Sequence, residues 1–112
     1  MCIRDRSPAQ EQALLDQGRT VFVDYTAAWC ITCQFNKKTV LDDAEVQAIF
    51  RRRNVALLRA DWTRRDAAIT AALASLGRNG VPVYVLHKPG RPPHLLPEIL
   101  STNTISQALA AD

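Results

Sequence analysis

Long hydrophobic runs are missing from this chain. Over its 112 residues, no stretch approaches the ~18 apolar residues that a membrane-spanning helix requires, so we expect no direct insertion into a membrane. Residues 1–10 contain no apolar segment of the kind found in a signal peptide. Residues 1–6 show neither a hydrophobic pattern nor turn residues. We therefore interpret residues 1–7 as a non-native or disordered N-terminus and residues 8–112 as one domain.

Cysteine and net charge are also low. Three cysteines are too few for the disulfide framework of a small secreted domain. The net charge is +3 and the basic residues are scattered, so we expect no binding to nucleic acid. A hydrophobic fraction of 47% and a charged fraction of 22% are typical of a globular protein. The length allows one hydrophobic core and is too short for two.

The hydrophobic pattern predicts alternating helices and strands. Strands are expected over about 20–26, 55–61, 81–86 and 94–97, and helices over about 8–17, 31–40, 43–50, 64–76 and 103–110. We expect Asp42 and Thr63 to cap two of these helices, and Phe35 and Val40 to face inward. Strands separated by helices imply parallel pairing, and the Pro89-Gly90 turn implies an antiparallel hairpin. The sequence thus predicts an α/β fold with a mixed central sheet flanked by helices on both faces.

Cys30 and Cys33 follow an apolar strand directly and stand at the start of a predicted helix. The free N–H groups and the dipole of a helix N-terminus favour a thiolate on Cys30, and Cys33, one turn further, is close enough to close a disulfide. These are the properties that thiol–disulfide exchange requires. We expect an exposed Cys30 to attack a partner's disulfide and Cys33 to resolve the mixed disulfide. Trp29, Ile31 and Thr32 are the expected substrate-binding neighbours.

Three other interpretations of the cysteine pair remain. A zinc site needs four ligands, and the chain offers only Cys2, His87 and His94 besides the pair, so we expect no metal. The pair could also serve a net oxidase or isomerase, because the redox potential cannot be derived from sequence. From a different class, the fold could be a non-catalytic binding module.

Asp24 interrupts the apolar strand before the cysteines. An acid among apolar neighbours is costly to bury unless it has a partner or is kept neutral by a raised pKa. Asp24 lies six residues before Cys30, so its carboxyl is expected behind the thiol pair, where it could help to deprotonate Cys33. A solvated acid at a sheet edge is the alternative. Arg59, on the next central strand, is its expected partner.

The Val81-Pro82 bond precedes the third predicted strand. A proline that opens a buried strand after Gly80 fits a tight cis turn, although few X-Pro bonds are cis. A cis bond would expose the Val81 backbone beside the cysteines, where it could pair with an extended partner segment. Val81 and Pro82 are therefore expected to bind substrate.

These three features together resemble the thioredoxin family over about residues 19–110. That family combines an apolar strand with a buried Asp, a W-C-x-x-C helix start and a cis-proline loop before the third strand. Residues 23–33 (VDYTAAWCITC), 59–63 (RADWT) and 80–84 (GVPVY) look most like the C-terminal periplasmic domain of bacterial thiol:disulfide interchange reductases of the DsbD and ScsB type. Residues 95–100 (LLPEIL) also resemble that group, whereas ordinary thioredoxins have Gly-Pro between the cysteines.

The resemblance implies a thioredoxin-like fold and a protein-disulfide reductase at the periplasmic side of the inner membrane. It implies that a membrane domain of a longer parent protein reduces Cys30–Cys33, and that this domain then reduces disulfide-bearing proteins or thioredoxin-like domains. We expect a monomer without a cofactor. Relatives often carry Glu seven residues after the first cysteine. Lys37 stands there in this chain and would favour the Cys30 thiolate, whereas an acid would disfavour it.

Overall fold

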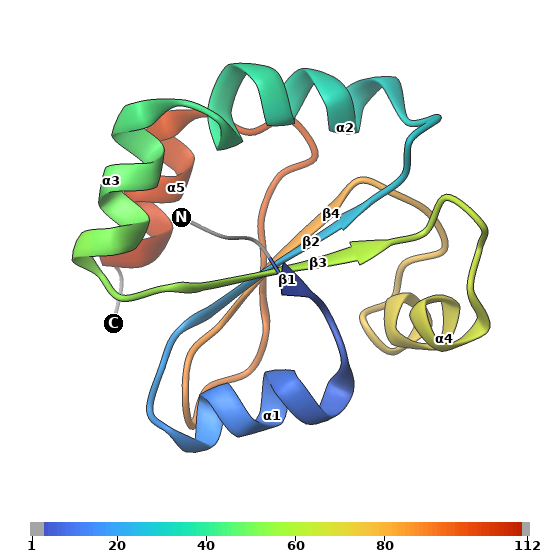
Figure 1. The fold of residues 1–112 in the computed structure, drawn as a ribbon, viewed down its shortest axis with the longest axis horizontal. Helices are drawn as coiled ribbons and strands as arrows, with labels where there is room; N and C mark the ends of the chain where they lie inside the picture. The colour runs from blue at the N-terminus through green and yellow to red at the C-terminus, as the bar shows by residue number, and fades with distance from the viewer. Residues whose placement is uncertain (1–3, 111–112) are drawn as a thin grey trace.

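A mixed β-sheet forms the centre of the molecule. A computed structural model describes residues 4–110, and within them five strands pair in the order β1-β3-β2-β4-β5. β1, β3 and β2 are parallel, β4 is antiparallel to β2, and β5 is antiparallel to β4. The predicted mixed sheet is confirmed (Figure 1). The strands are β1 (Arg4–Asp5), β2 (Val21–Thr26), β3 (Ala56–Asp61), β4 (Val83–His87) and β5 (His94–Leu95).

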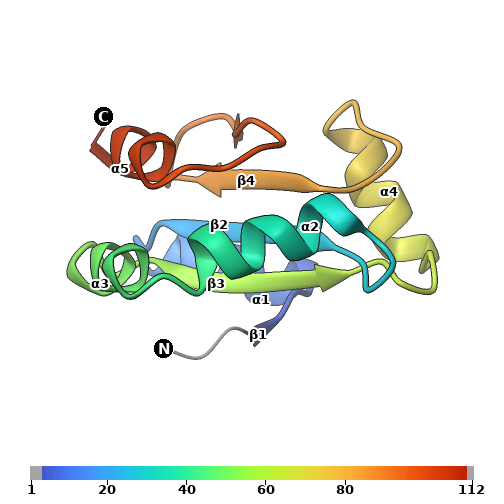
Figure 2. The ribbon, with the colours of Figure 1, turned by 90° about the horizontal axis from the view of Figure 1, so that it is seen from above.

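Helices cover both faces of this sheet, as predicted. α1 (Pro8–Asp16) and α4 (Ala67–Ser75) pack on one face, where Leu14 and Leu73 join the apolar residues of β2, β3 and β4. The other face carries α2 (Ile31–Asn36), the π-helical turn η1 (Lys37–Leu41), α3 (Ala44–Arg52) and α5 (Thr102–Ala110). Figure 1 shows the two groups on opposite sides of the strands, and Figure 2 shows α2 lying over β2 and β3.

Both helix caps predicted above were wrong, one by a single residue and the other by three residues. Asp43, not Asp42, caps α3 and accepts hydrogen bonds from the N–H groups of Glu45 and Val46. Asp66, not Thr63, caps α4. In both places two residues able to cap lie close together, and the one that caps directly precedes the first residue of the helix.

The helix that follows the cysteines is shorter than predicted. α2 ends at Asn36 and continues as the π-helical turn, in which the N–H of Asp42 donates to the carbonyl of Lys37. Val40 is buried as expected, but Phe35 is 53% exposed, so its predicted inward orientation was wrong. The side chains of α2 that point to the sheet are those of Cys33 and Asn36, and Phe35 lies between them in sequence on the solvent side.

The edges of the sheet also differ from the sequence prediction. Arg4 and Asp5 form a short parallel edge strand beside β3, in a segment where no strand was expected. β4 begins at Val83, two residues later than predicted, and β5 covers only two residues instead of four. Residues 1–3 and 111–112 lie outside the described part of the chain.

Candidate active site

The cysteine pair lies at the end of the sheet where three loops meet. These loops connect β2 to α2, β3 to α4, and α4 to β4, and they gather at the same end of the molecule (Figures 1 and 2). Cys30 is the N-cap residue of α2: its backbone is extended, and its Sγ accepts a hydrogen bond of 3.1 Å from the N–H of Cys33. A negative charge on this sulfur would therefore be stabilised by the helix start.

Cys30 and Cys33 form a disulfide. Their Cα atoms are 5.2 Å apart, within the usual range for such a bond. Cys30 was expected to be exposed, but only 7% of its surface is accessible, because its sulfur is bonded to Cys33 and packs with Ala27 and Val81. Cys33 is only 2% accessible. Of the two cysteines, Cys30 is the more accessible residue.

Asp24 is buried on the α2 face of the sheet, with 4% of its surface accessible. The predicted neighbour Arg59 is its register partner on β3. Burial raises the pKa of Asp24 to about 6, while the positive charges of Arg59 and Lys37 act in the opposite direction. A carboxyl with this pKa is partly protonated near pH 6, so it can both take up and release a proton there.

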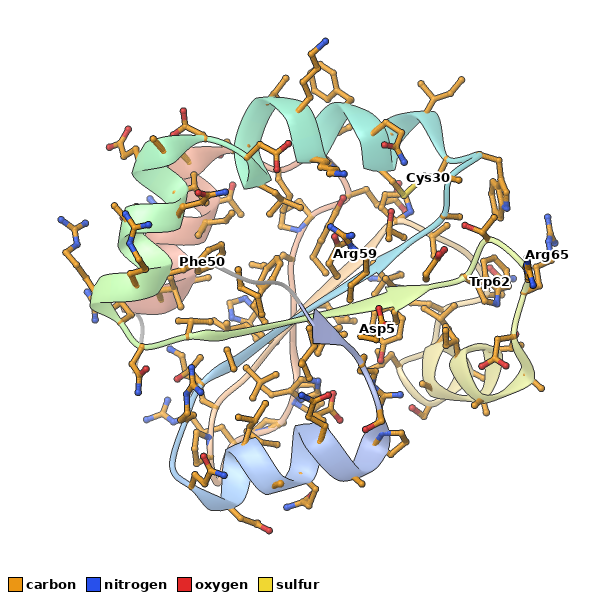
Figure 3. The ribbon with its side chains drawn as sticks, viewed as in Figure 1. Asp5, Cys30, Phe50, Arg59, Trp62 and Arg65 are labelled. Atoms are coloured by element: carbon orange, nitrogen blue, oxygen red, sulfur yellow. A yellow bond between two sulfur atoms is a disulfide. The ribbon has the colours of Figure 1, made fainter. Side chains whose placement is uncertain are left out.

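A polar hollow of about 130 Å³ connects Asp24 with the surroundings of the disulfide. Asp24 Oδ1 and Arg59 Nε are buried and have no hydrogen-bond partner within residues 4–110, and both residues line this hollow. Figure 3 shows Arg59 between the sheet and α2. Gln34, next to Cys33, also lines it and donates a hydrogen bond to the carbonyl of Ala27. Asp24 thus shares this hollow with Ala28 and Gln34, which lie on either side of the cysteine pair in sequence.

The loop before β4 places Val81 against the cysteines. The Val81-Pro82 bond is cis, which the sequence analysis had left open. Val81 packs on Ala27, Cys30 and Cys33, and it lies outside the ladder between β2 and β4, which begins at Val83. Pro82 is buried. The Val81 backbone is therefore close to the disulfide and is not used by the sheet.

The residues around Cys30 differ in exposure. Trp29 is 48% exposed and Ile31 86% exposed, whereas Thr32 is partly buried. Trp29 is held by its Nε1, which donates a 3.0 Å hydrogen bond to the carbonyl of Thr63. Thr63 also accepts a hydrogen bond from the N–H of Ala28 through its Oγ1. The β3–α4 loop thus fixes the segment that leads into Cys30.

Sequence reasoning missed Asn36, the polar residue that ties α2 to the rest of the fold. Its side chain is fully buried and makes three hydrogen bonds: it donates to Tyr84 Oη and to the carbonyl of Glu98, and accepts from the N–H of Leu100. One signal was present in the sequence. Asn36 follows Cys33 by three residues, so a helix that buries Cys33 places Asn36 on the same face.

A mixed sheet, a Cys-x-x-Cys disulfide at the start of α2 and a cis-proline turn beside it define the class of thioredoxin-fold proteins with a dithiol/disulfide site. The model of the thioredoxin-like family matches residues 3–89. The chain belongs to this family.

The curated relatives are thiol:disulfide interchange proteins named DsbD. The protein DsbD 1 of Pseudomonas aeruginosa is 35% identical over 88 residues, which are 75% of this chain and 15% of the relative. DsbD of Pseudomonas fluorescens is 39% identical over 66 residues, 55% of this chain and 11% of the relative. The chain thus spans about a seventh or less of these proteins.

Solved structures show the same fold. The oxidised C-terminal domain of DsbD from Neisseria meningitidis superposes with a TM-score of 0.73 at 22% identity, covering 94% of this chain and 96% of that domain. The reduced form of the same domain also gives a TM-score of 0.73, at 21% identity. The predicted thioredoxin-like fold is therefore confirmed.

Proposed function

We propose that this chain is a thiol–disulfide oxidoreductase domain that works as a protein-disulfide reductase. The observation that carries the proposal is the Cys30–Cys33 disulfide at the start of α2, with Cys30 as the more accessible cysteine. The names of the DsbD relatives, thiol:disulfide interchange proteins, support it.

The exchange moves two electrons from the domain to its partner. In the reduced domain the Cys30 thiolate attacks one sulfur of the partner's disulfide, the partner's S–S bond breaks, and one partner thiolate leaves. The Cys33 thiolate then attacks the Cys30 sulfur, which re-forms the Cys30–Cys33 bond and releases the second partner thiolate. Both released thiolates take up protons, so the partner ends as a dithiol.

Five residues are proposed to hold the partner during this exchange. Trp29, Ile31 and Thr32 adjoin the reacting sulfur, and Val81 and Pro82 form the facing loop. Because the Val81 backbone lies outside the sheet ladder, it can pair with an extended segment of the partner, as an added strand would. Apolar side chains beside the partner's cysteine would then contact the exposed side chains of Trp29 and Ile31.

Asp24 is proposed as the proton acceptor for Cys33 in the second step. Only the carboxylate can accept a proton, and the pKa of Asp24 is about 6. The rate of resolution is therefore expected to rise as the pH increases through about 6. In Asp24→Asn we expect resolution at pH 7 to slow by about 100-fold, at the lower end of the usual range for general base catalysis, and this rise to disappear. Stopped-flow measurement of mixed-disulfide decay from pH 5 to 8 checks this, and an unchanged pH profile would reject the role.

The place of the domain in a longer protein is part of the proposal. By similarity to the DsbD relatives, a membrane domain of the parent protein would reduce Cys30–Cys33 at the periplasmic side of the inner membrane. The acceptor would be another thioredoxin-like domain or a disulfide-bearing protein. Within residues 4–110, no helix is both long enough and apolar enough to cross a bilayer, so such a membrane domain would be a separate part of the parent.

The redox potential separates the reductase from an oxidase or isomerase. A domain that gives electrons to disulfides must have a lower potential than its acceptors. We therefore expect the Cys30–Cys33 couple to lie below about −200 mV, nearer to thioredoxin at about −270 mV than to the oxidant DsbA at about −120 mV. The check is equilibration with glutathione buffers, acid quenching and mass spectrometry. A value near −120 mV would favour the oxidase, and a pair that does not exchange would favour the binding module.

A further inference from the structure

A cationic side chain is held beside the cysteine pair by two tryptophans. The guanidinium carbon of Arg65 lies 5.1 Å from the ring centre of Trp29 and 5.2 Å from that of Trp62. The two rings are themselves 6.0 Å apart. Both distances from the cation are within the range of cation–π attraction. Arg65 thus sits over the ring of the residue that directly precedes Cys30.

The loop that carries Arg65 is fixed to the active site at several points. Thr63 receives hydrogen bonds from the Ala28 N–H and from Trp29 Nε1, and Trp62 Nε1 donates a 2.8 Å hydrogen bond to Thr70 on α4. Arg65 itself has a φ of +52°, in the left-handed region. Figure 3 shows Trp62 and Arg65 at the same end of the molecule as Cys30. The position of the cation is therefore set by the fold.

The acids near this loop have other partners. Asp61 accepts hydrogen bonds from the N–H and the hydroxyl of Thr63, and Asp66 accepts the N–H of Ile69 as the cap of α4. The two salt bridges found within residues 4–110 involve Arg6, Glu11 and His87, far from this loop in sequence. Arg65 is exposed, so its charge is oriented by the rings and is open to an anion from outside.

We propose that Arg65 selects partners that carry Asp or Glu close to their reacting cysteine. The inference rests on the proposed exchange at Cys30, and it adds the charge of the preferred partner. A partner segment bound at Cys30 passes Trp29, and an acidic side chain a few residues from the partner's cysteine would meet the guanidinium held there. Because the two rings already hold the Arg65 side chain, it loses little conformational entropy on binding. This makes it a better recognition group than a freely moving arginine.

Synthetic peptide disulfides test this directly. The probes are disulfide-linked dimers of one short peptide, with Asp, Asn or Lys placed two residues before and after its single cysteine. The reduced domain is mixed with each dimer at low ionic strength, and the released peptide thiol is measured after acid quenching. Each rate is divided by the rate of the same dimer with dithiothreitol, because a charge near a cysteine changes its reactivity by itself.

The normalised rate for the Asp dimer is expected to exceed that for the Asn dimer by about 3- to 10-fold, and the Lys dimer should be slowest. In Arg65→Gln this preference, taken as the ratio of the Asp rate to the Asn rate, should fall to less than 2-fold. Arg65→Lys, which keeps the charge but not the planar stacking, should retain part of it. High salt should reduce the preference in the unaltered domain.

Arg64→Gln is the matched control. It removes the same charge from the neighbouring exposed position, which makes no ring contact of the kind that Arg65 makes. The Asp preference should survive in this variant. Equal losses in both variants, or equal rates of the unaltered domain with Asp and Asn dimers, would overturn the inference and leave the exchange itself standing. A folded domain that reduces none of the dimers would instead contradict the proposed function and the inference with it.

Discussion

Cys30→Ser is expected to abolish reduction of protein disulfides, with a loss of at least ~10³-fold, whereas Cys33→Ser is expected to stop after the first step. The reason is that Cys30 is the more accessible cysteine and caps α2, while Cys33 is only 2% accessible. Cys33→Ser should therefore accumulate a mixed disulfide between Cys30 and the partner. Insulin reduction in the presence of dithiothreitol measures the loss, and mass spectrometry without reductant detects the mixed disulfide.

Cys2→Ser is the control for this pair of variants. Cys2 is the third cysteine of the chain and lies outside the described residues. Cys2→Ser should reduce insulin at the same rate as the unaltered domain. It should accumulate no mixed disulfide. Activity that survives in Cys30→Ser, or that is lost in Cys2→Ser, would move the nucleophile away from Cys30 and remove the basis of the proposed mechanism.

Asn36→Ala is expected to lower the free energy of unfolding by about 2–5 kcal/mol. The substitution removes the three hydrogen bonds of a buried side chain, two of them buried and the one to the Glu98 carbonyl partly buried, and it leaves the buried N–H of Leu100 without this partner. Each buried polar group left unpaired costs about 1–3 kcal/mol. Urea denaturation followed by circular dichroism provides the measurement.

Asn79→Ala is the matched control for Asn36→Ala, because Asn79 is exposed in the loop between α4 and β4. We expect it to change the stability by less than ~0.5 kcal/mol. A loss below 1 kcal/mol in Asn36→Ala would show that the link between α2 and residues 98–100 contributes little to the fold.

The central part of the fold could be predicted because its signals are local. β2 (VFVDYT) and β3 (ALLRAD) are rich in apolar residues, and the Cys-x-x-Cys pair stands where α2 begins. The burial of Asp24 also follows from its direct neighbours, and Arg59 was predicted beside it because β3 was predicted correctly, although no hydrogen bond joins Asp24 Oδ1 or Arg59 Nε to a partner within residues 4–110. The helix caps were harder, since Asp42 and Asp43 offer the same chemistry and only the backbone conformation of the folded chain decides between them.

Other features depend on contacts between distant segments. Arg4 and Asp5 become a strand only because β3 has a free edge beside them. Asn36 meets residues 98–100 across more than sixty positions of sequence, and Arg65 meets Trp29 across more than thirty. Trp62 lies only three residues before Arg65, but nothing in that local sequence indicates that Trp29 will pack on the same guanidinium.

The burial of Asp24 lowers the free energy of unfolding near neutral pH. Its pKa is raised in the fold from an ordinary value of 3.8 to about 6, so the folded state is favoured when the carboxyl is protonated. This contribution is complete below pH 3.8 and is lost as the pH rises through 6, which amounts to about 3 kcal/mol at 1.36 kcal/mol per pKa unit. If Asp24 acts as proposed, its replacement by an uncharged residue would raise the stability of the domain near neutral pH and slow the resolution step.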